Sequence, residues 1–149
     1  MSDNYLRLIP SDPRWRPSER PAQDAATLLS RYCPDADRCS AEFCEEVTFF
    51  DAGAKTESIT CPFCRTNLGD WWGDAMGRAY RSKFADLTIK TPCCDSETSL
   101  NDLTYVWPAA FGSFALEAAN PGRPSLSEAE RLELERTLGS PLKLVWQHV

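Results

Sequence analysis

The sequence has little of what usually marks an enzyme active site or a membrane segment. It contains one histidine, His148, whereas general acid–base catalysis and hydrolytic metal centres most often use histidine. Its 7 glycines do not follow the spacing of a phosphate-binding loop. Its apolar runs are far shorter than a membrane-spanning helix, and its first residues lack the apolar stretch of a secretory signal peptide. We therefore expect a non-catalytic protein of the cytoplasm with no membrane contact.

Basic residues are also in short supply. The chain has 16 Lys and Arg against 22 Asp and Glu, which gives a formal net charge of −6. Proteins that bind nucleic acid usually carry a basic face. The chain has no long basic run, and its most basic segment is the N-terminal one, which contains Arg7, Arg14, Arg16 and Arg20. Nucleic acid is therefore disfavoured as a partner, whereas an acidic surface complements a basic protein partner.

Cysteine, in contrast, is plentiful, with 7 residues in the chain. In a reducing compartment, paired cysteines more often bind a metal ion or carry out redox chemistry than form structural disulfides. The segment Cys61-Pro62-Phe63-Cys64 has two residues between its thiols, a spacing that lets both sulfurs face one ion. Thr91-Pro92-Cys93-Cys94 repeats this pattern, except that Thr91 replaces the first cysteine. The sequence thus predicts one structural Zn²⁺, with four ligands: Cys61, Cys64, Cys93 and Cys94.

The choice of fourth ligand leaves alternatives open. Cys93 and Cys94 are neighbours, and adjacent side chains on an extended strand point to opposite faces, so both can bind one ion only if the chain turns between them. If Cys94 alone binds, the fourth ligand is a carboxylate or one of four other residues: Cys33, Cys39, Cys44 or His148. The spacing of the three upstream cysteines is looser than that of a metal-binding pair, so we expect them to be separate thiols.

The same cysteine pair has a competing interpretation as a redox site. In thioredoxin-like and glutaredoxin-like proteins, a strand leads into a Cys-Pro-x-Cys motif at a helix N-terminus, and the first cysteine, here Cys61, is the nucleophile. The helix expected here starts near residue 71, too far along the chain for its dipole to act on Cys61, and a redox role leaves Cys93 and Cys94 unexplained. We therefore favour a metal site over a thiol–disulfide oxidoreductase, with a nucleic-acid-binding zinc ribbon as the third hypothesis.

Hydrophobic spacing and turn residues predict an α+β fold, organised as one compact domain. We expect residues 1–20 to form an extended, proline-rich arm that packs on the body, and residues 21–149 to form a single zinc-binding domain. The predicted helices cover 21–32, 71–84 with Asp70 as the cap, and 127–138 with a capping box from Ser127 and Glu130. This last helix belongs to a C-terminal strand–helix–strand unit.

Strands are predicted where β-branched and aromatic residues alternate with polar ones. They cover 45–50, 58–60, 87–89 and 142–149, and residues 99–119 are expected to form two short strands broken at Trp107-Pro108 and at Gly112. Residues 34–43 are expected to be a polar connection. Trp107 belongs to an aromatic cluster that is either part of the core or an exposed patch for binding a protein.

Several segments together resemble small stand-alone bacterial zinc-ribbon-like proteins that have no assigned biochemical role. They are VTFFDAG, ITCPFC, TPCCDSETSLNDLTYVWPAAF, ALEAANP and the closing LGSPLKLVWQHV, and they span most of the chain. The resemblance implies a compact metal-bearing fold and no particular substrate. Such proteins usually have glycine after the second cysteine, because glycine reaches a left-handed backbone conformation easily; here Arg65 and Asp95 take its place. The function expected from the sequence is that of a zinc-binding adaptor, regulator or immunity-like inhibitor acting through protein contacts.

Overall fold

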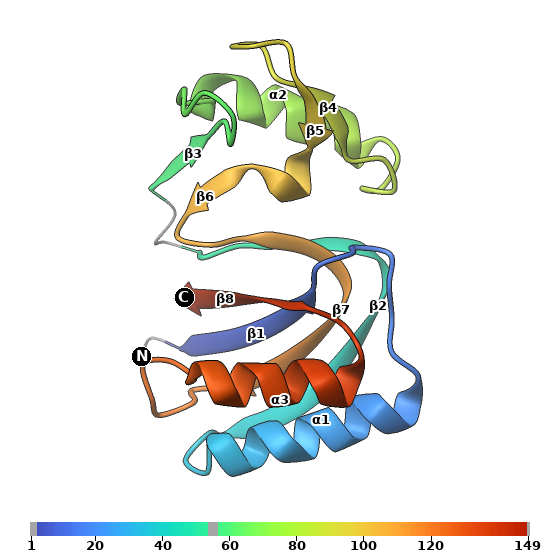
Figure 1. The fold of residues 1–149 in the computed structure, drawn as a ribbon, viewed down its shortest axis with the longest axis vertical. Coiled ribbons are helices and arrows are strands. Elements are labelled where there is room, and N and C mark those ends of the chain that lie inside the picture. Colours follow the sequence, from blue (N-terminus) through green and yellow to red (C-terminus); the bar gives the residue numbers. More distant parts are fainter. Residues whose placement is uncertain (1–2, 54–56, 149) are drawn as a thin grey trace.

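The computed structural model describes residues 3–53 and 57–148, which form two halves stacked along the long axis (Figure 1). One half, called the sheet half below, comprises residues 3–53 and 107–148 and contains a four-stranded sheet with two helices. The other, called the cysteine half, comprises residues 57–106 and contains one helix and short strands. In the described residues no helix is long and apolar enough to cross a membrane.

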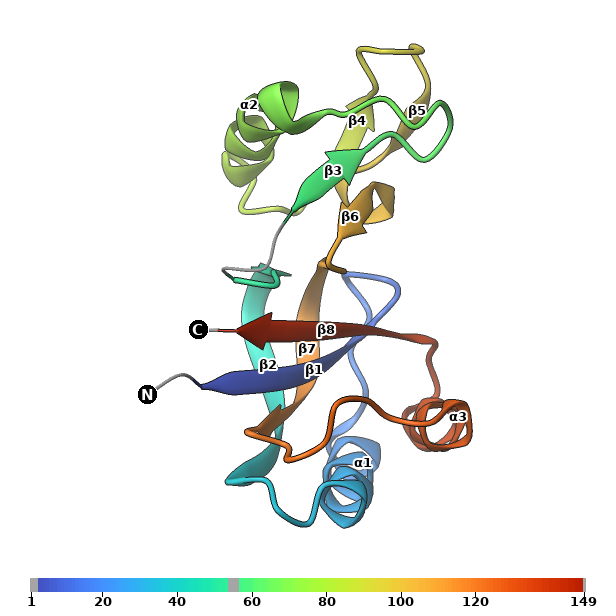
Figure 2. The ribbon, with the colours of Figure 1, turned by 90° about the vertical axis from the view of Figure 1, so that its left-hand side faces the viewer.

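The sheet half is built on an antiparallel sheet with the strand order β2-β7-β1-β8. Its strands are β1 (Asn4–Pro10), β2 (Arg38–Phe50), β7 (Ala110–Ala119) and β8 (Leu142–His148). Strands β1 and β8 cross β2 and β7 at a steep angle (Figure 2). Residues 4–10, expected only as an extended segment packed on the body, therefore form an inner strand of the sheet.

Two helices, α1 (Glu19–Tyr32) and α3 (Glu128–Leu138), cover one face of this sheet. The buried side of α1 is mostly alanine, which lets the helix approach the strands closely, and Leu29 and Leu134 fill the space around Phe114. The capping box predicted for α3 is confirmed, and the helix ends at Gly139 with a left-handed φ of 93°. The β7–α3–β8 segment is the expected strand–helix–strand unit, with β1 lying between its two strands.

The cysteine half has short elements and little sheet. Strands β3 (Ser58–Thr60) and β6 (Thr104–Val106) form one two-stranded ladder, and β4 (Thr88–Lys90) and β5 (Glu97–Ser99) form another. Helix α2 (Gly69–Tyr80) packs through Ala75 and Ala79 onto a small core that includes Cys61. The 3₁₀ turn η1 (Leu100–Asp102) links the second ladder to β6.

Phe111 and Asn101 are two of the residues that connect the halves. Phe111 of β7 is fully buried and belongs to the core of the cysteine half. Asn101 of η1 is also buried, and its Oδ1 accepts a hydrogen bond of 2.9 Å from the Phe111 N–H. Its Nδ2 donates to the carbonyl of Ser11 at 3.1 Å, and its own carbonyl accepts from Lys143 Nζ at 2.8 Å. Burial lowers the pKa of Lys143, whose ammonium lies at this junction.

Three local predictions were wrong. The expected polar connection at 34–43 is largely strand β2, because Cys39 and Ala41 pack on the core beneath the helices while Ser40 between them is polar. Strand β7 continues through Gly112, where a Cβ would lie 2.5 Å from Ile9 Cγ2; glycine permits the close packing there instead of ending the strand. Asp70 lies in the first turn of α2, whose N-cap is Leu68, and the helix ends at Tyr80 rather than at residue 84. Val149, predicted to end the last strand, lies outside the described residues.

Candidate metal centre

Two six-residue turns with the same hydrogen bonds carry the cysteine cluster. In the first turn, Cys61–Thr66, the N–H of Cys61 donates to the carbonyl of Thr66 at 2.9 Å, and the N–H of Arg65 donates to the carbonyl of Cys61 at 3.0 Å. In the second, Thr91–Ser96, the matching bonds from Thr91 to Ser96 and from Asp95 to Thr91 are both 2.9 Å. The two turns are therefore equivalent position by position, as the aligned prolines in the sequence indicated.

The fifth position of each turn has a left-handed backbone, although neither residue is glycine. Arg65 has a φ of 64° and Asp95 a φ of 59°. A residue with a Cβ reaches this conformation at some energetic expense, and aspartate tolerates it better than most. The geometry that glycine would favour is thus present at both positions, and the turn hydrogen bonds on either side hold it in place.

The sulfurs of Cys61, Cys64, Cys93 and Cys94 all lie within 4.8 Å of one another. The Sγ–Sγ distances are 3.2 Å for Cys64–Cys93, 3.7 Å for Cys61–Cys94 and 3.9 Å for Cys93–Cys94. An ion bound by four sulfurs at 2.3 Å in a tetrahedron requires sulfurs about 3.8 Å apart. The four cysteines, none of which is in a disulfide, can therefore hold one metal ion.

The position of Cys93 explains how two neighbouring cysteines share one cluster. In the second turn Thr91 occupies the place of Cys61, and Cys93 occupies the place of Phe63. Because residues 91–96 form a tight turn and not an extended strand, Cys93 and Cys94 do not point to opposite faces. The second turn thus supplies its two sulfurs from its third and fourth positions, whereas the first turn supplies them from its first and fourth. The Thr91 hydroxyl, at the first position, lies 3.3 Å from the Cys94 sulfur.

Hydroxyl groups lie beside the exposed sulfurs, again at equivalent positions. Thr66 Oγ1 is 3.1 Å from Cys64 Sγ, and Ser96 Oγ is 3.3 Å from Cys94 Sγ. Hydrogen bonds from Thr66, first from its hydroxyl and then from its backbone, lower the pKa of Cys64 to about 6. Hydrogen bonds from Ser96 and Thr91 lower the pKa of Cys94. Both cysteines are consequently prepared to be thiolates, the form that binds metal.

Cys93 behaves in the opposite way. Desolvation of its sulfur, followed by its hydrogen bond to Cys64, raises the pKa of Cys93 to about 12. Although the residue as a whole is exposed, its sulfur faces the three others, and a further negative charge there is unfavourable. A bound cation reverses this effect, so the charge on all four thiolates is compatible with the cluster only when an ion is present.

We predict that removing either hydroxyl weakens metal binding. Thr66→Val and Ser96→Ala each delete a group that stabilises a thiolate, and loss of such an outer partner typically reduces metal affinity about 10-fold to 100-fold. Competition against a chromophoric chelator measures the change. Thr104→Val is the matched control, because Thr104 is exposed on β6 and its hydroxyl has no hydrogen-bond partner among residues 3–53 and 57–148. Equal affinities for the three variants would show that the hydroxyls do not support the ligands.

The remaining candidate residues lie elsewhere. In residues 3–53 and 57–148, no other group of three or more His, Cys, Asp or Glu side chains is arranged to hold an ion. Cys33 is buried at the end of α1, and Cys39 and Cys44 are half-buried on β2, as expected for separate thiols. His148 hydrogen-bonds to Asn4 Oδ1 at 2.6 Å. The guanidinium groups of Arg14 and Arg16 donate to the carbonyls of Ala85 and Cys44.

Thr66, Thr91 and Ser96 were missed by the sequence analysis. Their signal was present in the sequence, because aligning the two turns on their prolines places Thr66 and Ser96 at the same position. Comparison with known proteins adds no further residue: no protein-family model, no curated protein and no solved structure matches this chain. The resemblance to bacterial zinc-ribbon-like proteins stays a prediction.

Proposed function

We propose that the chain is a cytoplasmic, non-catalytic zinc-binding protein of the zinc-ribbon type, which acts through contacts with a basic protein partner as an adaptor, regulator or immunity-like inhibitor. The observation that carries the metal assignment is the convergence of four sulfurs from two equivalent turns within 4.8 Å. Thiolates are soft ligands, and a set of four favours Zn²⁺ or iron–sulfur chemistry over hard cations. Zinc is the simpler assignment, because a single ion satisfies all four sulfurs.

Four sulfur ligands also support a structural role for the ion. A tetrahedral zinc bound by four protein ligands has no open position for water or substrate, in contrast to catalytic zinc sites. The two turns come from opposite ends of the cysteine half, before α2 and between β4 and β5. One ion therefore joins two segments that are 30 positions apart in the sequence.

The proposed role in protein binding is supported by surface composition. Four thiolates and one Zn²⁺ carry a combined charge of −2, which adds to the formal net charge of −6. Several large apolar side chains are also exposed, among them Phe63 at 58%, Tyr80 at 68% and Trp107 at 40%. Exposed aromatic residues on an acidic surface are suited to a partner that is basic and partly apolar.

Metal analysis of the purified protein tests the proposed site. We expect one zinc per chain after exhaustive dialysis, with the content falling to near zero in Cys93→Ser. Cys44→Ser is the matched control and should keep its zinc, since Cys44 is half-buried on β2 outside the cluster. A metal-free wild-type protein, or a Cys93→Ser variant that still holds one zinc tightly, would contradict the assignment.

A thiol–disulfide oxidoreductase is the second candidate, and one observation favours it. Cys64 is exposed and its pKa is lowered to about 6, as in reactive thiols. Cys61, expected to be the nucleophile, is only 1% exposed, so the attacking thiolate in this case would be Cys64. Insulin reduction with dithiothreitol as the reductant tests this candidate. Turnover that is lost in Cys64→Ser, in a protein without zinc, would favour it over the zinc site.

A further inference from the structure

A groove with a volume of about 690 Å³ lies at the edge of the sheet half, and none of the four clustered cysteines lines it. The start of β1, the end of β8, the β6–β7 loop and the β7–α3 connection form its walls. In Figure 1 these four segments lie on the left-hand side of the molecule, the side that faces the viewer in Figure 2. This volume is typical of ligand-binding clefts.

Aromatic rings make up much of the groove. Trp107, from the β6–β7 loop, is 40% exposed, and its ring meets the ring of His148 edge to face at a centroid distance of 6.3 Å. Trp146 of β8 lines the same groove. The face of a tryptophan ring attracts cations more strongly than any other aromatic side chain. The groove is therefore lined by two residues of the type that best binds a positively charged planar or alkylated group.

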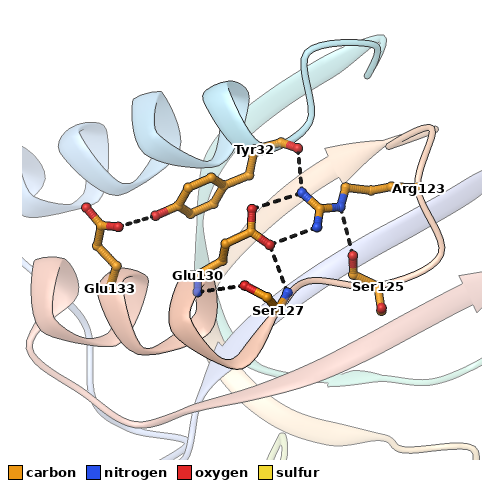
Figure 3. Close-up of polar contacts among 6 residues, drawn as sticks. All are labelled: Tyr32, Arg123, Ser125, Ser127, Glu130 and Glu133. Carbon is orange, nitrogen blue, oxygen red and sulfur yellow. Dashed lines mark hydrogen bonds and ion pairs between the residues drawn. The ribbon is translucent and has the colours of Figure 1, made fainter.

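The basic groups at the groove are already neutralised or occupied. Arg123 lines the groove, but its guanidinium forms two hydrogen bonds with Glu130, of 2.8 and 3.0 Å, and donates to the carbonyls of Tyr32 and Ser125, both at 2.8 Å (Figure 3). His148 Nδ1 is hydrogen-bonded to Asn4 Oδ1. Arg123 therefore presents no unpaired positive charge to the groove.

Three carboxylates accept hydrogen bonds from residues that line the groove. Glu57 accepts a hydrogen bond from Trp107 Nε1 at 3.2 Å. Asp3 and Asp37 accept from Asn120 Nδ2 at 3.2 and 2.8 Å. In the described part of the chain, none of the three forms an ion pair with a basic side chain. Three negative charges therefore lie next to Trp107 and Asn120, two lining residues of the groove, and such charges are complementary to a cation.

We propose that this groove binds an arginine side chain of a basic peptide segment in the partner protein. Arginine combines a planar cation that stacks on aromatic rings with a fork of donors that matches carboxylates. A peptide is favoured because β8 is an edge strand: one side pairs with β1, and the other side is bridged at its end, where His148 pairs with Gly53 and its N–H donates to the Ala52 carbonyl at 3.3 Å. In the described residues the backbone of residues 143–146 has no partner on that side. An added strand along β8 would place its side chains beside the groove.

This proposal rests on the basic partner of the proposed function, and its test is independent of the metal. The probe is the blocked pentapeptide acetyl-Thr-Val-Arg-Val-Thr-amide, titrated into the full chain while the indole N–H signals of Trp107 and Trp146 are followed by NMR. A matched peptide has glutamine in place of arginine. We expect the arginine peptide to bind at least 5-fold more tightly, because a cation–π contact of about 1 kcal/mol corresponds to that factor.

Variants separate the groove from a general effect of charge. Trp107→Leu should weaken the arginine peptide about 5-fold to 30-fold, the range expected for a cation–π contact. Tyr80→Leu removes an aromatic residue that is 68% exposed on α2 in the other half, and should leave the affinity unchanged. Glu57→Gln should weaken binding and reduce its dependence on salt.

Equal binding of the two peptides, or unchanged affinity in Trp107→Leu, would overturn the proposal. So would a concentration-dependent dimer in which a second copy of the chain covers the groove, as detected by sedimentation. Zinc content is measured on the same samples. A wild-type protein that holds one zinc but does not bind the peptide would count against the groove alone. A wild-type protein that binds the peptide but holds no zinc would count against the metal site alone.

Discussion

Removal of the proposed zinc ion is expected to unfold the cysteine half while the sheet half keeps its structure. The cysteine half depends on two ladders of three residues per strand, and an isolated two-stranded ladder is marginally stable in water. Helix α2 has no side-chain cap at its N-terminus and contains Gly73 and Gly77, each of which lowers helix stability by about 1 kcal/mol relative to alanine. These elements provide little stability without the ion.

The expected size of this effect follows from the energetics of structural zinc. Four-ligand sites in small domains bind zinc with apparent free energies of roughly 10 kcal/mol or more near neutral pH, and this energy is coupled to folding. The two short ladders and the one helix of the cysteine half do not supply a comparable free energy. The sheet half has its own core, in which α1 and α3 cover Leu6, Leu8 and Phe114, and none of those contacts involves the cluster.

Hydrogen exchange with and without a strong chelator measures this prediction. In the presence of chelator we expect amide protection to be lost in β3, α2 and β4, and to be retained in β1 and the C-terminal part of β7, which serve as an internal control. Adding zinc back should restore the lost protection. Full protection of α2 in the chelated protein would show that the cysteine half folds without metal, and the structural role of the ion would then be wrong.

The four cysteines of the site were predictable from the sequence because their information is local. The Cys-Pro-x-Cys segment and its near-repeat, which starts at Thr91-Pro92, determine two turns. The hydrogen bonds of each turn join residues no more than five positions apart. The role of Cys93 was predicted with an alternative, since a sequence does not reveal whether the chain turns between two neighbours. The hydroxyls of Thr66 and Ser96 were missed because serine and threonine are common in turns for other reasons.

Elements of the fold that depend on distant partners were harder to predict. Strand β1 pairs with β7 and β8, and Asn4 is hydrogen-bonded to Asn120, 116 residues away. Nothing in residues 4–10 alone indicates such partners, so the segment was expected only to be extended. Helix α3 was predicted accurately because its capping box and its terminal glycine act within a few residues of the helix ends.

Phe111→Ala is expected to produce the largest loss of stability from a single substitution outside the metal site. Phe111 is fully buried, and its ring contacts Phe49 at a centroid distance of 4.8 Å and Phe84 at 5.3 Å. Truncating a buried phenylalanine typically destabilises a protein by about 3–5 kcal/mol, because contacts are lost and a cavity remains. Urea denaturation of the metal-loaded protein gives the change in the free energy of unfolding.

The position of Phe111 makes this substitution a test of how the two halves cooperate. Phe43→Ala is the control: Phe43 lies on the neighbouring strand β2 and contacts Phe114 at 4.9 Å, but it is 44% exposed, so a loss of about 1 kcal/mol is expected. Because Phe111 belongs to β7 and to the core of the cysteine half, its loss should lower hydrogen-exchange protection in both halves. If Phe111→Ala destabilises the protein no more than Phe43→Ala, the Phe111 ring does not couple the two halves, and this prediction is wrong.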